Sequence, residues 1–472
     1  MKRKASLALV CAVLSLAFAL AADEVVAQTI TVAPVDPTIR VGQIQQFTAI
    51  GISSPTAIEA GAYHTCALLE DATARCWGLN DNGQLGDGSQ TDSSTPVAVA
   101  RVTGAAAVTG GGFHSCARFP NGTLQCWGRN SEGQLGDPAT TAFFSATPVP
   151  VTGMTTATAV TGGGYHTCAL LQNGTVRCWG QNDYGQLGNG TVSPALVPSV
   201  TNSTPVEVFG ITTATAVSAG GWHACALLQN GTVRCWGQND YGQLGDGSPI
   251  TQRPVPAARK PTPIPVEVTG ITTAVAVESG AFHTCALLQD GTMRCWGWNE
   301  FGQLTLTPAF DSSSTPVTVS GVTPAALAPG AEHTCVLLRD GRVQCWGDNG
   351  YGQLGNGSPR GVFPAPGATV TAITTATAAT SGIEHGCALL QGGTVQCWGR
   401  GLFGRLGDGT SGDTDAFTPV TVVGLGATWT SDDETVATIT ATGLATGRLP
   451  GFTPITATSG GRSGSTTLTV LP

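Results

Sequence analysis

The chain is poor in charge and in long apolar stretches. Only 11% of its 472 residues are charged, and the formal net charge is -9. So few basic residues exclude the broad basic surface that nucleic-acid-binding proteins use for phosphate contacts, and no nucleic-acid partner is expected. After residue 20 no stretch is long and apolar enough to cross a membrane as a helix, so no membrane span is expected.

Glycine and cysteine are the residues that stand out. The chain has 65 glycines, and the Val, Thr and Ala runs between them are typical of a turn-dense all-β protein. Of the 15 cysteines, all but one form pairs ten positions apart, and the pairs recur at intervals of 50 to 60 residues. Such a period indicates an array of similar units. The seven pairs are Cys66 with Cys76, Cys116 with Cys126, Cys168 with Cys178, Cys225 with Cys235, Cys285 with Cys295, Cys335 with Cys345, and Cys387 with Cys397.

Each cysteine pair flanks a predicted β-hairpin. In residues 162 to 190, the turn at 172 to 174 (Gln-Asn-Gly) separates two apolar runs. A three-residue loop with a left-handed glycine places Cys168 opposite Cys178 at a non-hydrogen-bonded position, where Cα atoms lie about 4.5 Å apart. Seven structural disulfides within the units are therefore expected. Ala72 replaces the loop glycine in the first unit, where strain or a different turn is expected.

Metal binding or redox chemistry is the alternative use of paired cysteines. Zinc ligands come about two to four residues apart, and redox motifs place about two residues between the sulfurs, which this spacing does not match. The histidines lie two positions before the first cysteine of each unit, on a ring too wide to gather three of them at one metal. Each is expected to bond to a neighbouring turn, and no metal or cofactor is expected. They are His64, His114, His166, His223, His283, His333 and His385.

The first 28 residues have the pattern of an export signal. A basic start, an apolar stretch from Ala5 to Leu20 and a small-residue pattern at 19 to 21 predict a signal peptide. The fifteenth cysteine, Cys11, lies inside it. Export supplies the oxidising compartment that disulfides need. The mature protein is therefore expected to be secreted, periplasmic or at the cell surface.

The repeated line resembles a known family. The pattern H-[TS]-C-A-L-L-x-[ND]-G-T-V-x-C-W-G-x-N-x-x-G-Q-L-G is similar to the repeat of the regulator of chromosome condensation family. The resemblance covers residues 52 to 425 and implies a seven-bladed β-propeller, in which the tryptophan after each second cysteine packs between blades. Altered turns are expected in unit five, FGQLTLT, and in unit seven, LFGRLGDG. The family's nucleotide exchange on the Ran GTPase is not expected, because an exported protein does not meet that partner.

The flanks of the repeats resemble a second family. Residues 29 to 51 and 426 to 472 resemble two parts of a bacterial immunoglobulin-like domain of the intimin and invasin type. Neither part has enough strands to close a sandwich alone. The propeller is therefore predicted to be inserted between the strand of Phe47 and the strand of Trp429. The alternative makes the first flank a closing strand of the propeller. The predicted division is a signal peptide at 1–28, the first part of the immunoglobulin-like domain at 29–51, the propeller at 52–425 and the second part at 426–472.

One position of the repeat changes character between units. The residue before each histidine is aromatic in five units and acidic in two, whereas a core position would hold similar residues in all seven. These side chains are predicted to form a ring at one end of the propeller and to bind a partner. The alternative is that the aromatics only cap the blades. The residues are Tyr63, Phe113, Tyr165, Trp222, Phe282, Glu332 and Glu384.

No arrangement of Ser, His and Asp or of paired carboxylates stands out as catalytic. The chain is therefore predicted to be a monomeric, non-catalytic binding or adhesion module with a protein or carbohydrate partner at the cell surface. Two alternatives stay open. One is a secreted enzyme inhibitor that resembles the β-lactamase inhibitor propellers. The other is a polysaccharide-active enzyme, whose signature would be a cluster of acids in one loop.

Overall fold

The computed structural model describes residues 30–50, 53–193, 203–250, 261–304, 311–360, 368–410, 412–440, 443–459 and 462–472. The predicted signal peptide, with Cys11, lies outside these residues. Within them the chain consists of strands and turns, with a single short 3-10 element, η2 (Leu402–Gly404). The predicted all-β fold class is confirmed.

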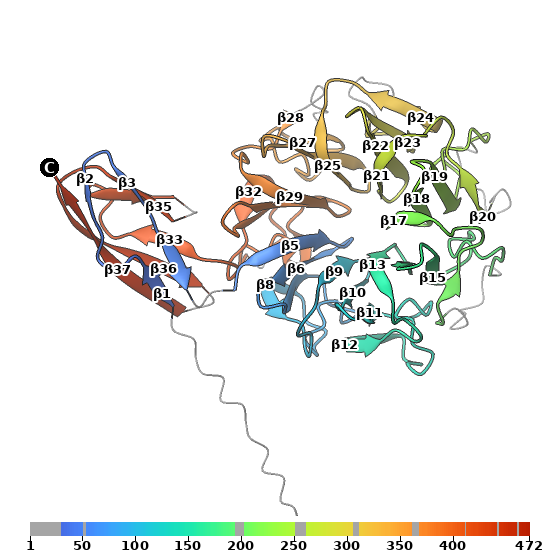
Figure 1. Cartoon of the computed structure of the whole chain (residues 1–472), viewed down its shortest axis with the longest axis horizontal. Helices are drawn as coiled ribbons and strands as arrows, with labels where there is room; N and C mark the ends of the chain where they lie inside the picture. The colour runs from blue at the N-terminus through green and yellow to red at the C-terminus, as the bar shows by residue number, and fades with distance from the viewer. Residues whose placement is uncertain are drawn as a thin grey trace, which may run out of the picture.

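Seven four-stranded antiparallel sheets stand in a ring (Figure 1). We call each sheet a blade, and its strands follow chain order from the ring centre outward. Blade 1 consists of β5 (Pro55–Ala60), β6 (His64–Leu69), β7 (Ala74–Gly78) and β8 (Ser93–Ala98). The innermost strands contact one another from blade to blade, and β29 (Ala376–Ser381) of the last blade contacts β5 of the first. These contacts close the ring.

The other six blades repeat this order of strands. They are, in turn, β9 (Ala107–Gly110), β10 (His114–Arg118), β11 (Leu124–Arg129) and β12 (Phe144–Pro150); β13 (Ala157–Gly162), β14 (His166–Leu171), β15 (Val176–Gly180) and β16 (Val206–Glu207); β17 (Ala214–Ala219), β18 (His223–Leu228), β19 (Val233–Gly237) and β20 (Thr262–Glu267); β21 (Ala274–Ser279), β22 (His283–Leu288), β23 (Met293–Gly297) and β24 (Ser313–Val319); β25 (Pro324–Pro329), β26 (His333–Leu338), β27 (Val343–Gly347) and β28 (Ala368–Thr369); and β29, β30 (His385–Leu390), β31 (Val395–Gly399) and β32 (Ala416–Thr421).

The cysteine hairpins have the predicted register. Cys168 lies opposite Cys178 in the β14–β15 pair, and the same holds in every blade. All seven disulfides form within units, with Cα–Cα distances of 4.0 to 4.1 Å. Ala72 keeps the turn that glycine makes elsewhere, since its N–H donates to Leu69 O at 2.9 Å. Its φ of 60° is unfavourable for a residue with a Cβ, which is the strain predicted for unit one.

The tryptophan after each second cysteine packs against the preceding blade. Trp236 of blade 4 is fully buried in a cluster that contains Leu170 and Val176 of blade 3. Its indole N–H donates to the carbonyl oxygen of Gln186, 3.0 Å away in blade 3. Every other blade has an equivalent bond, from Trp77, Trp127, Trp179, Trp296, Trp346 and Trp398. The blade strands are therefore covered on both faces, which explains their continuous apolar runs.

Of the two units for which altered turns are predicted, only unit seven shows one in the described residues. In unit five, Leu304 N–H donates to Asn299 Oδ1 at 2.8 Å, as the equivalent pair does in other units, so the turn is ordinary as far as Leu304. Residues 305–310 lie outside the described residues. In unit seven, η2 forms, and Phe403 has a φ of 66°. The turn of unit seven is thus altered, while its blade is retained.

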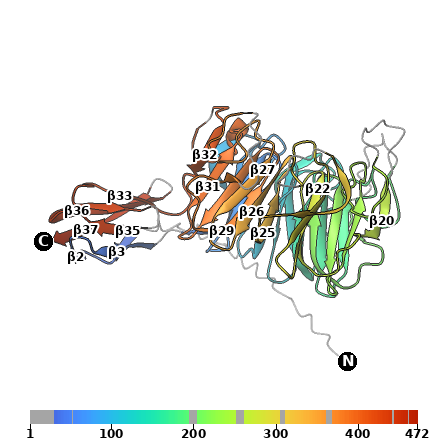
Figure 2. The same cartoon turned by 90° about the horizontal axis from the view of Figure 1, so that it is seen from above.

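Strands from the two ends of the chain share sheets beside the ring (Figures 1 and 2). One sheet contains β2 (Thr38–Arg40), which runs parallel to β37 (Arg462–Leu471), followed by β36 (Gly451–Ser459) and β33 (Thr428–Ser431). Another contains β3 (Ile44–Gln46), β35 (Leu444–Gly447) and β34 (Ala437–Ile439), and a third pairs β1 (Thr31–Ala33) with β4 (Thr48–Ile50).

These end strands enclose a core of their own. Phe47 from the first flank is 1% exposed and packs in one cluster with Ile455 and Leu468 from the second. Strands of the first flank pair with one another and with residues 444 to 471, and none of them joins a blade. The alternative of a closing propeller strand at 29 to 51 therefore does not match these pairings. The domain boundaries stay a prediction.

Candidate binding site at the centre of the ring

A tight loop joins the first and second strands of each blade at one end of the ring. In blade 1 it runs through Gly61, Ala62 and Tyr63, between β5 and β6. A Cβ on Gly61 would lie 2.3 Å from Cε1 of His64 and 2.6 Å from Gly111 O, so no larger residue fits. The carbonyl oxygen of Tyr63 accepts a hydrogen bond from the N–H at position 79, at 3.0 Å, and this bond recurs in all seven blades. The loop therefore holds the residue before each histidine in one backbone position.

The seven predicted binding residues occupy these equivalent loop positions, and we call them the mouth ring. All seven side chains are half-buried. The five aromatic ones form a continuous arc of ring contacts. The centroid distances are 5.2 Å for Tyr63 and Phe113, 5.6 Å for Phe113 and Tyr165, 6.4 Å for Tyr165 and Trp222, and 5.2 Å for Trp222 and Phe282. The two remaining members, Glu332 and Glu384, occupy the next two blades and complete the circle.

A second set of side chains beside the arc was not predicted. The ring of Trp298 lies 5.3 Å from that of Phe282 and 5.4 Å from that of Phe301. Arg129 lies over the ring of Tyr165, at 5.1 Å from its centroid. The sequence does contain a signal for this second set, because the residue after each C-W-G also changes character between units. It holds Leu79, Arg129, Gln181, Gln238, Trp298, Asp348 and Arg400.

Glu384 is the mouth-ring carboxylate that is neutralised. Its Oε2 accepts from Nη1 of Arg400 at 2.8 Å and from Nη1 of Arg405 at 3.2 Å. Arg405 is fully buried, and its guanidinium lies 5.2 Å from the ring centroid of Tyr63. This arginine stands where the other units have the glutamine of GQLG. The altered turn of unit seven thus supplies a cation that no other blade has at this position.

Glu332 is the mouth-ring carboxylate without a cation. No ion pair to Glu332 exists among the residues that the structure describes. Burial, together with repulsion from Asp348, Glu384 and Glu300, raises the pKa of Glu332 to about 7. Burial also raises the pKa of Asp348, although this carboxylate accepts a hydrogen bond from Gln353 at 2.6 Å. The side of the mouth opposite the aromatics therefore carries carboxyl groups, and Glu332 has no cation among the described residues to balance its charge when it ionises.

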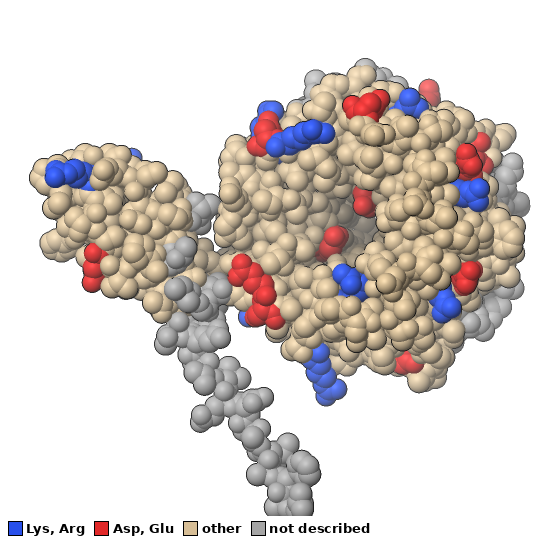
Figure 3. Space-filling model, viewed as in Figure 1, with Lys and Arg blue, Asp and Glu red and all other residues tan. Residues whose placement is uncertain are grey.

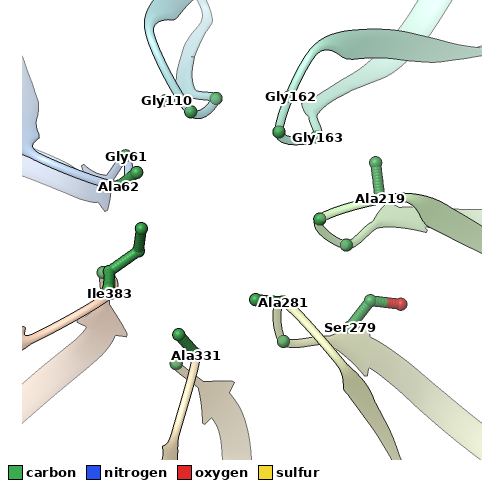
Figure 4. Close-up of a pocket in the computed structure, with 18 of the residues that line it drawn as sticks. Gly61, Ala62, Gly110, Gly162, Gly163, Ala219, Ser279, Ala281, Ala331 and Ile383 are labelled. Carbon is green, nitrogen blue, oxygen red and sulfur yellow. The ribbon is translucent and has the colours of Figure 1, made fainter. Parts of the chain in front are cut away.

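The loops surround a central cavity of about 370 Å³, lined by residues of all seven blades. Figure 4 shows that short side chains and glycines from successive blades face this opening, among them Gly61, Gly110, Ala281 and Ala331. Six members of the mouth ring also line it, whereas Glu384 does not, being paired with its arginines. Figure 3 shows acidic side chains in the hollow at the centre of the ring.

Two further carboxylates lie deeper, and the sequence analysis did not single them out. Glu59 on β5 and Glu278 on β21 have equivalent registers, opposite Cys66 and Cys285, and both are exposed. Each directly precedes a residue that lines the cavity, on a strand whose free edge faces the ring axis. These two side chains therefore contact water in the central opening of the ring and not on its outer surface.

The position of Glu59 and Glu278 near the ring axis raises the pKa of both carboxyls. Burial, with repulsion from Glu278, raises the pKa of Glu59 to about 8. Burial raises the pKa of Glu278 to about 7, although its Oε2 accepts a hydrogen bond from Ser218 Oγ at 2.9 Å. Glu59 has no hydrogen bond or ion pair among the described residues. The axis of the ring is therefore acidic below the mouth as well as at it.

The histidines lie between blades and not at the cavity. All seven are fully buried. His114 Nε2 lies 2.8 Å from Thr167 Oγ1 of the next blade, and that hydroxyl donates to Gln134 O at 2.9 Å. The hydroxyl therefore accepts from Nε2–H, and burial keeps the histidine neutral by lowering the pKa of His114 to about 4. In the five units where the next blade offers a hydroxyl, the expected bond to a neighbouring turn is replaced by this bond to a neighbouring strand. Among the described residues no group of three metal-ligating side chains is found.

Comparisons with known proteins agree with this architecture. The model of the regulator of chromosome condensation (RCC1) repeat matches residues 76–118, 121–170, 173–227, 230–287 and 340–389, more than half of the chain. The chain belongs to the RCC1 repeat family. A second model of the RCC1 repeat matches six segments between residues 56 and 353. The bacterial Ig-like domain (group 2) model matches residues 414–470, so the resemblance of the second flank is also confirmed.

Several curated proteins share the RCC1 repeats. The ultraviolet-B receptor UVR8 of Arabidopsis thaliana is 28% identical over 250 residues, which cover 52% of this chain and 54% of the receptor. The secretion-regulating guanine nucleotide exchange factor of Mus musculus is 34% identical over 33% of this chain and 34% of its own length. The matched part thus spans about half or less of these relatives.

Solved structures support the fold alone. Prp20p of Saccharomyces cerevisiae, described with its binding to Gsp1p and histones, aligns with a TM-score of 0.61 at 21% identity, over 74% of this chain and 85% of its own. Human WBSCR16 aligns with a TM-score of 0.61 at 20% identity, over 73% and 89%. In the part of the chain that the structure describes, no helix has the length and apolarity needed to cross a membrane.

Proposed function

We propose that this RCC1-repeat protein is an exported, non-catalytic binding protein that captures a partner at the mouth ring. The observation that carries the proposal is the continuous arc of five half-buried aromatic rings at the rim of the central cavity. Half-buried aromatic side chains offer a large apolar contact area at a low cost in side-chain entropy, and they dominate binding energy at many interfaces.

Export is supported by the disulfides. Seven of them, one in each hairpin, are expected only in a compartment that keeps thiols oxidised. The histidines and the tryptophan that follows the second cysteine of each unit are buried in the packing between blades, so they are not available to a partner. Among the described residues, the mouth ring and its neighbours differ between blades and are partly open to solvent.

Alanine substitution of two arc residues tests the proposal. The mature protein, immobilised, is offered to host-cell and bacterial surface fractions, and the retained species is then titrated against Tyr165→Ala with Trp222→Ala. We expect affinity to fall at least about 30-fold, the effect of losing a hot spot of about 2 kcal/mol. Phe209→Ala is the matched control, because Phe209 is 63% exposed and lies outside the mouth ring.

The melting temperature separates binding from packing. If the double variant melts close to the unmodified protein and loses the partner, the arc is a binding surface. If it keeps the partner, or if its melting temperature drops steeply, the aromatics are packing residues that cap the blades and the proposal is wrong.

A further inference from the structure

The centre of the ring carries carboxylates that lack counter-ions. Glu384 takes both nearby arginines, whereas Glu332 at the rim and Glu59 inside have no ion pair among the described residues. The sequence contains lysine only at positions 2, 4 and 260, all outside those residues. Glu332 and Glu59 are thus left without a counter-ion among the described residues.

The shape of the cavity limits what can enter. Its wall is mostly glycine and alanine from successive blades, together with larger side chains such as Ile383 (Figure 4), and its volume is about 370 Å³. A Cβ at Gly112 would lie 2.3 Å from Gly164 O, so neighbouring loops already touch. A slender extended group fits such an opening better than a branched or ring-shaped one.

The two sides of the rim differ in chemistry. Aromatic faces from Tyr63 round to Phe282 supply apolar contact. Arg405 already lies over the ring of Tyr63, and Arg129 lies over those of Phe113 and Tyr165. Among the described residues, no cation lies over Trp222 or Phe282, so these two π-systems can attract a further one. The remaining side supplies Glu332, with Asp348 behind it. Further in, the carboxyl of Glu59 is repelled by that of Glu278, which favours the protonated form of Glu59 while no cation is present. An alkyl chain that ends in a positive charge complements both features at once.

We propose that the partner inserts a lysine side chain into the central cavity, with its methylenes against the aromatic arc and its ammonium among Glu332, Glu59 and Glu278. This inference rests on the proposed function and names the chemistry of the partner, a protein that presents a lysine on a projecting segment. Lysine is preferred to arginine because its charge is compact and its stem is flexible and unbranched, whereas guanidinium is planar and broad.

A blocked pentapeptide, acetyl-Gly-Ser-Lys-Ser-Gly-amide, is the probe, and saturation-transfer NMR with titration of the full mature chain is the measurement. The same peptide with norleucine in place of lysine retains the stem and lacks the ammonium. We expect the lysine peptide to bind at least about tenfold more tightly than the norleucine peptide. Equal affinities for the two peptides would overturn the proposal.

Charge-removing variants locate the site. Glu332→Gln and the double variant Glu59→Gln with Glu278→Gln should each weaken the lysine peptide by about tenfold or more. Glu207→Gln with Glu267→Gln removes the same number of carboxyl groups from exposed positions on the outer strands β16 and β20 and should change affinity less than about twofold. Equal weakening by the outer control would show that only net charge matters, and the proposal would fail.

The outcomes for the two proposals are distinguishable. If the natural partner is lost with the Tyr165 and Trp222 substitutions but retained by all the glutamine variants, the binding surface stands and the inserted lysine is wrong. If the glutamine variants also lose the partner and bind the two peptides equally, the lysine is supported as the group that enters the cavity.

Discussion

Thr65 of the first blade is hydrogen-bonded to His385 of the last, with 2.9 Å between Oγ1 and Nε2, although 320 residues separate them. The same kind of bond joins His64 to Ser115, His114 to Thr167, His223 to Thr284 and His283 to Thr334. The junction that closes the ring is thus built like the junctions between consecutive blades.

Replacing Thr65 with valine tests this closing bond. Valine keeps the shape of threonine but removes the hydroxyl, which leaves the buried Nε2 of His385 without a partner. We expect Thr65→Val to lower the free energy of unfolding by about 1–3 kcal/mol, measured by urea denaturation. Thr167→Val, at an internal junction, should cost a similar amount; an unchanged urea midpoint for Thr65→Val would contradict a role in closure.

A missing hydroxyl predicts a stabilising substitution. In unit four Ala224 stands where five other units have threonine or serine, and among the described residues His166 Nε2 has no hydrogen-bond partner. Ala224→Thr should supply the bond and raise the free energy of unfolding by about 1 kcal/mol, detected as a higher melting temperature. Gly386 leaves His333 Nε2 equally unpaired, but a Cβ there would lie 2.8 Å from the ring of Trp398. Gly386→Thr should therefore destabilise the protein, which makes it the contrasting variant.

The first hairpin offers a second stabilising change. Ala72 has a φ of 60° in a turn where all six other units place glycine with φ between 77° and 84°. Ala72→Gly should relieve a strain of about 1 kcal/mol and raise the melting temperature. The same alanine-to-glycine change at Ala57 on β5 lacks this benefit and should lower it. A drop in the melting temperature of Ala72→Gly would show that the turn is not strained.

The pH dependence of stability follows from two sets of buried groups. Burial lowers the pKa of His64, His166, His223 and His283 to about 3, from a usual 6.5, so unfolded chains bind protons that the folded chain does not. Stability is then lost as the pH falls below about 6.5, by about 1.4 kcal/mol per pH unit for each histidine.

The buried carboxyl groups have the opposite effect on the pH dependence of stability. Glu59 and Glu278 have raised pKa values of about 8 and about 7 against a usual 4.5, so their contribution is present at low pH and is lost as the pH rises to about 8. The melting temperature should therefore peak near about pH 6.5. In the variant Glu59→Gln with Glu278→Gln the decline above the peak should be weaker; an unchanged decline would show that these carboxyls are not its cause.

The end strands should form an independent domain if the propeller is an insertion. Deleting residues 52 to 425 and bridging the gap with a short glycine and serine linker retains the pairings of β2 with β37 and of β3 with β35. It also retains the cluster around Phe47. The product should be a folded β protein by circular dichroism and by amide dispersion in NMR. A disordered product would show that the two flanks need the propeller to fold.

Features within one hairpin were predictable because they depend on neighbours in sequence. The opposition of Cys168 and Cys178 follows from the length of the loop between them, and the strain at Ala72 follows from its missing glycine. The arc of the mouth ring was also predictable, since equivalent positions of a closed repeat must share one circle. The ion pair between Glu384 and Arg405 was not predictable, because nothing in the sequence indicates that the arginine in the turn of unit seven contacts the loop that carries Glu384.

The sequence by itself determined the repeat, the hairpin staples, the family and the ring position that varies, because each of these is written in local spacing and recurs in every unit. Only the tertiary structure decided that Glu59 and Glu278, 219 residues apart, share one enclosed axis and that Glu332 is left without a cation. The physical reason is that electrostatic coupling depends on distance in space and on exclusion of water. Both arise only when seven blades close around a common centre.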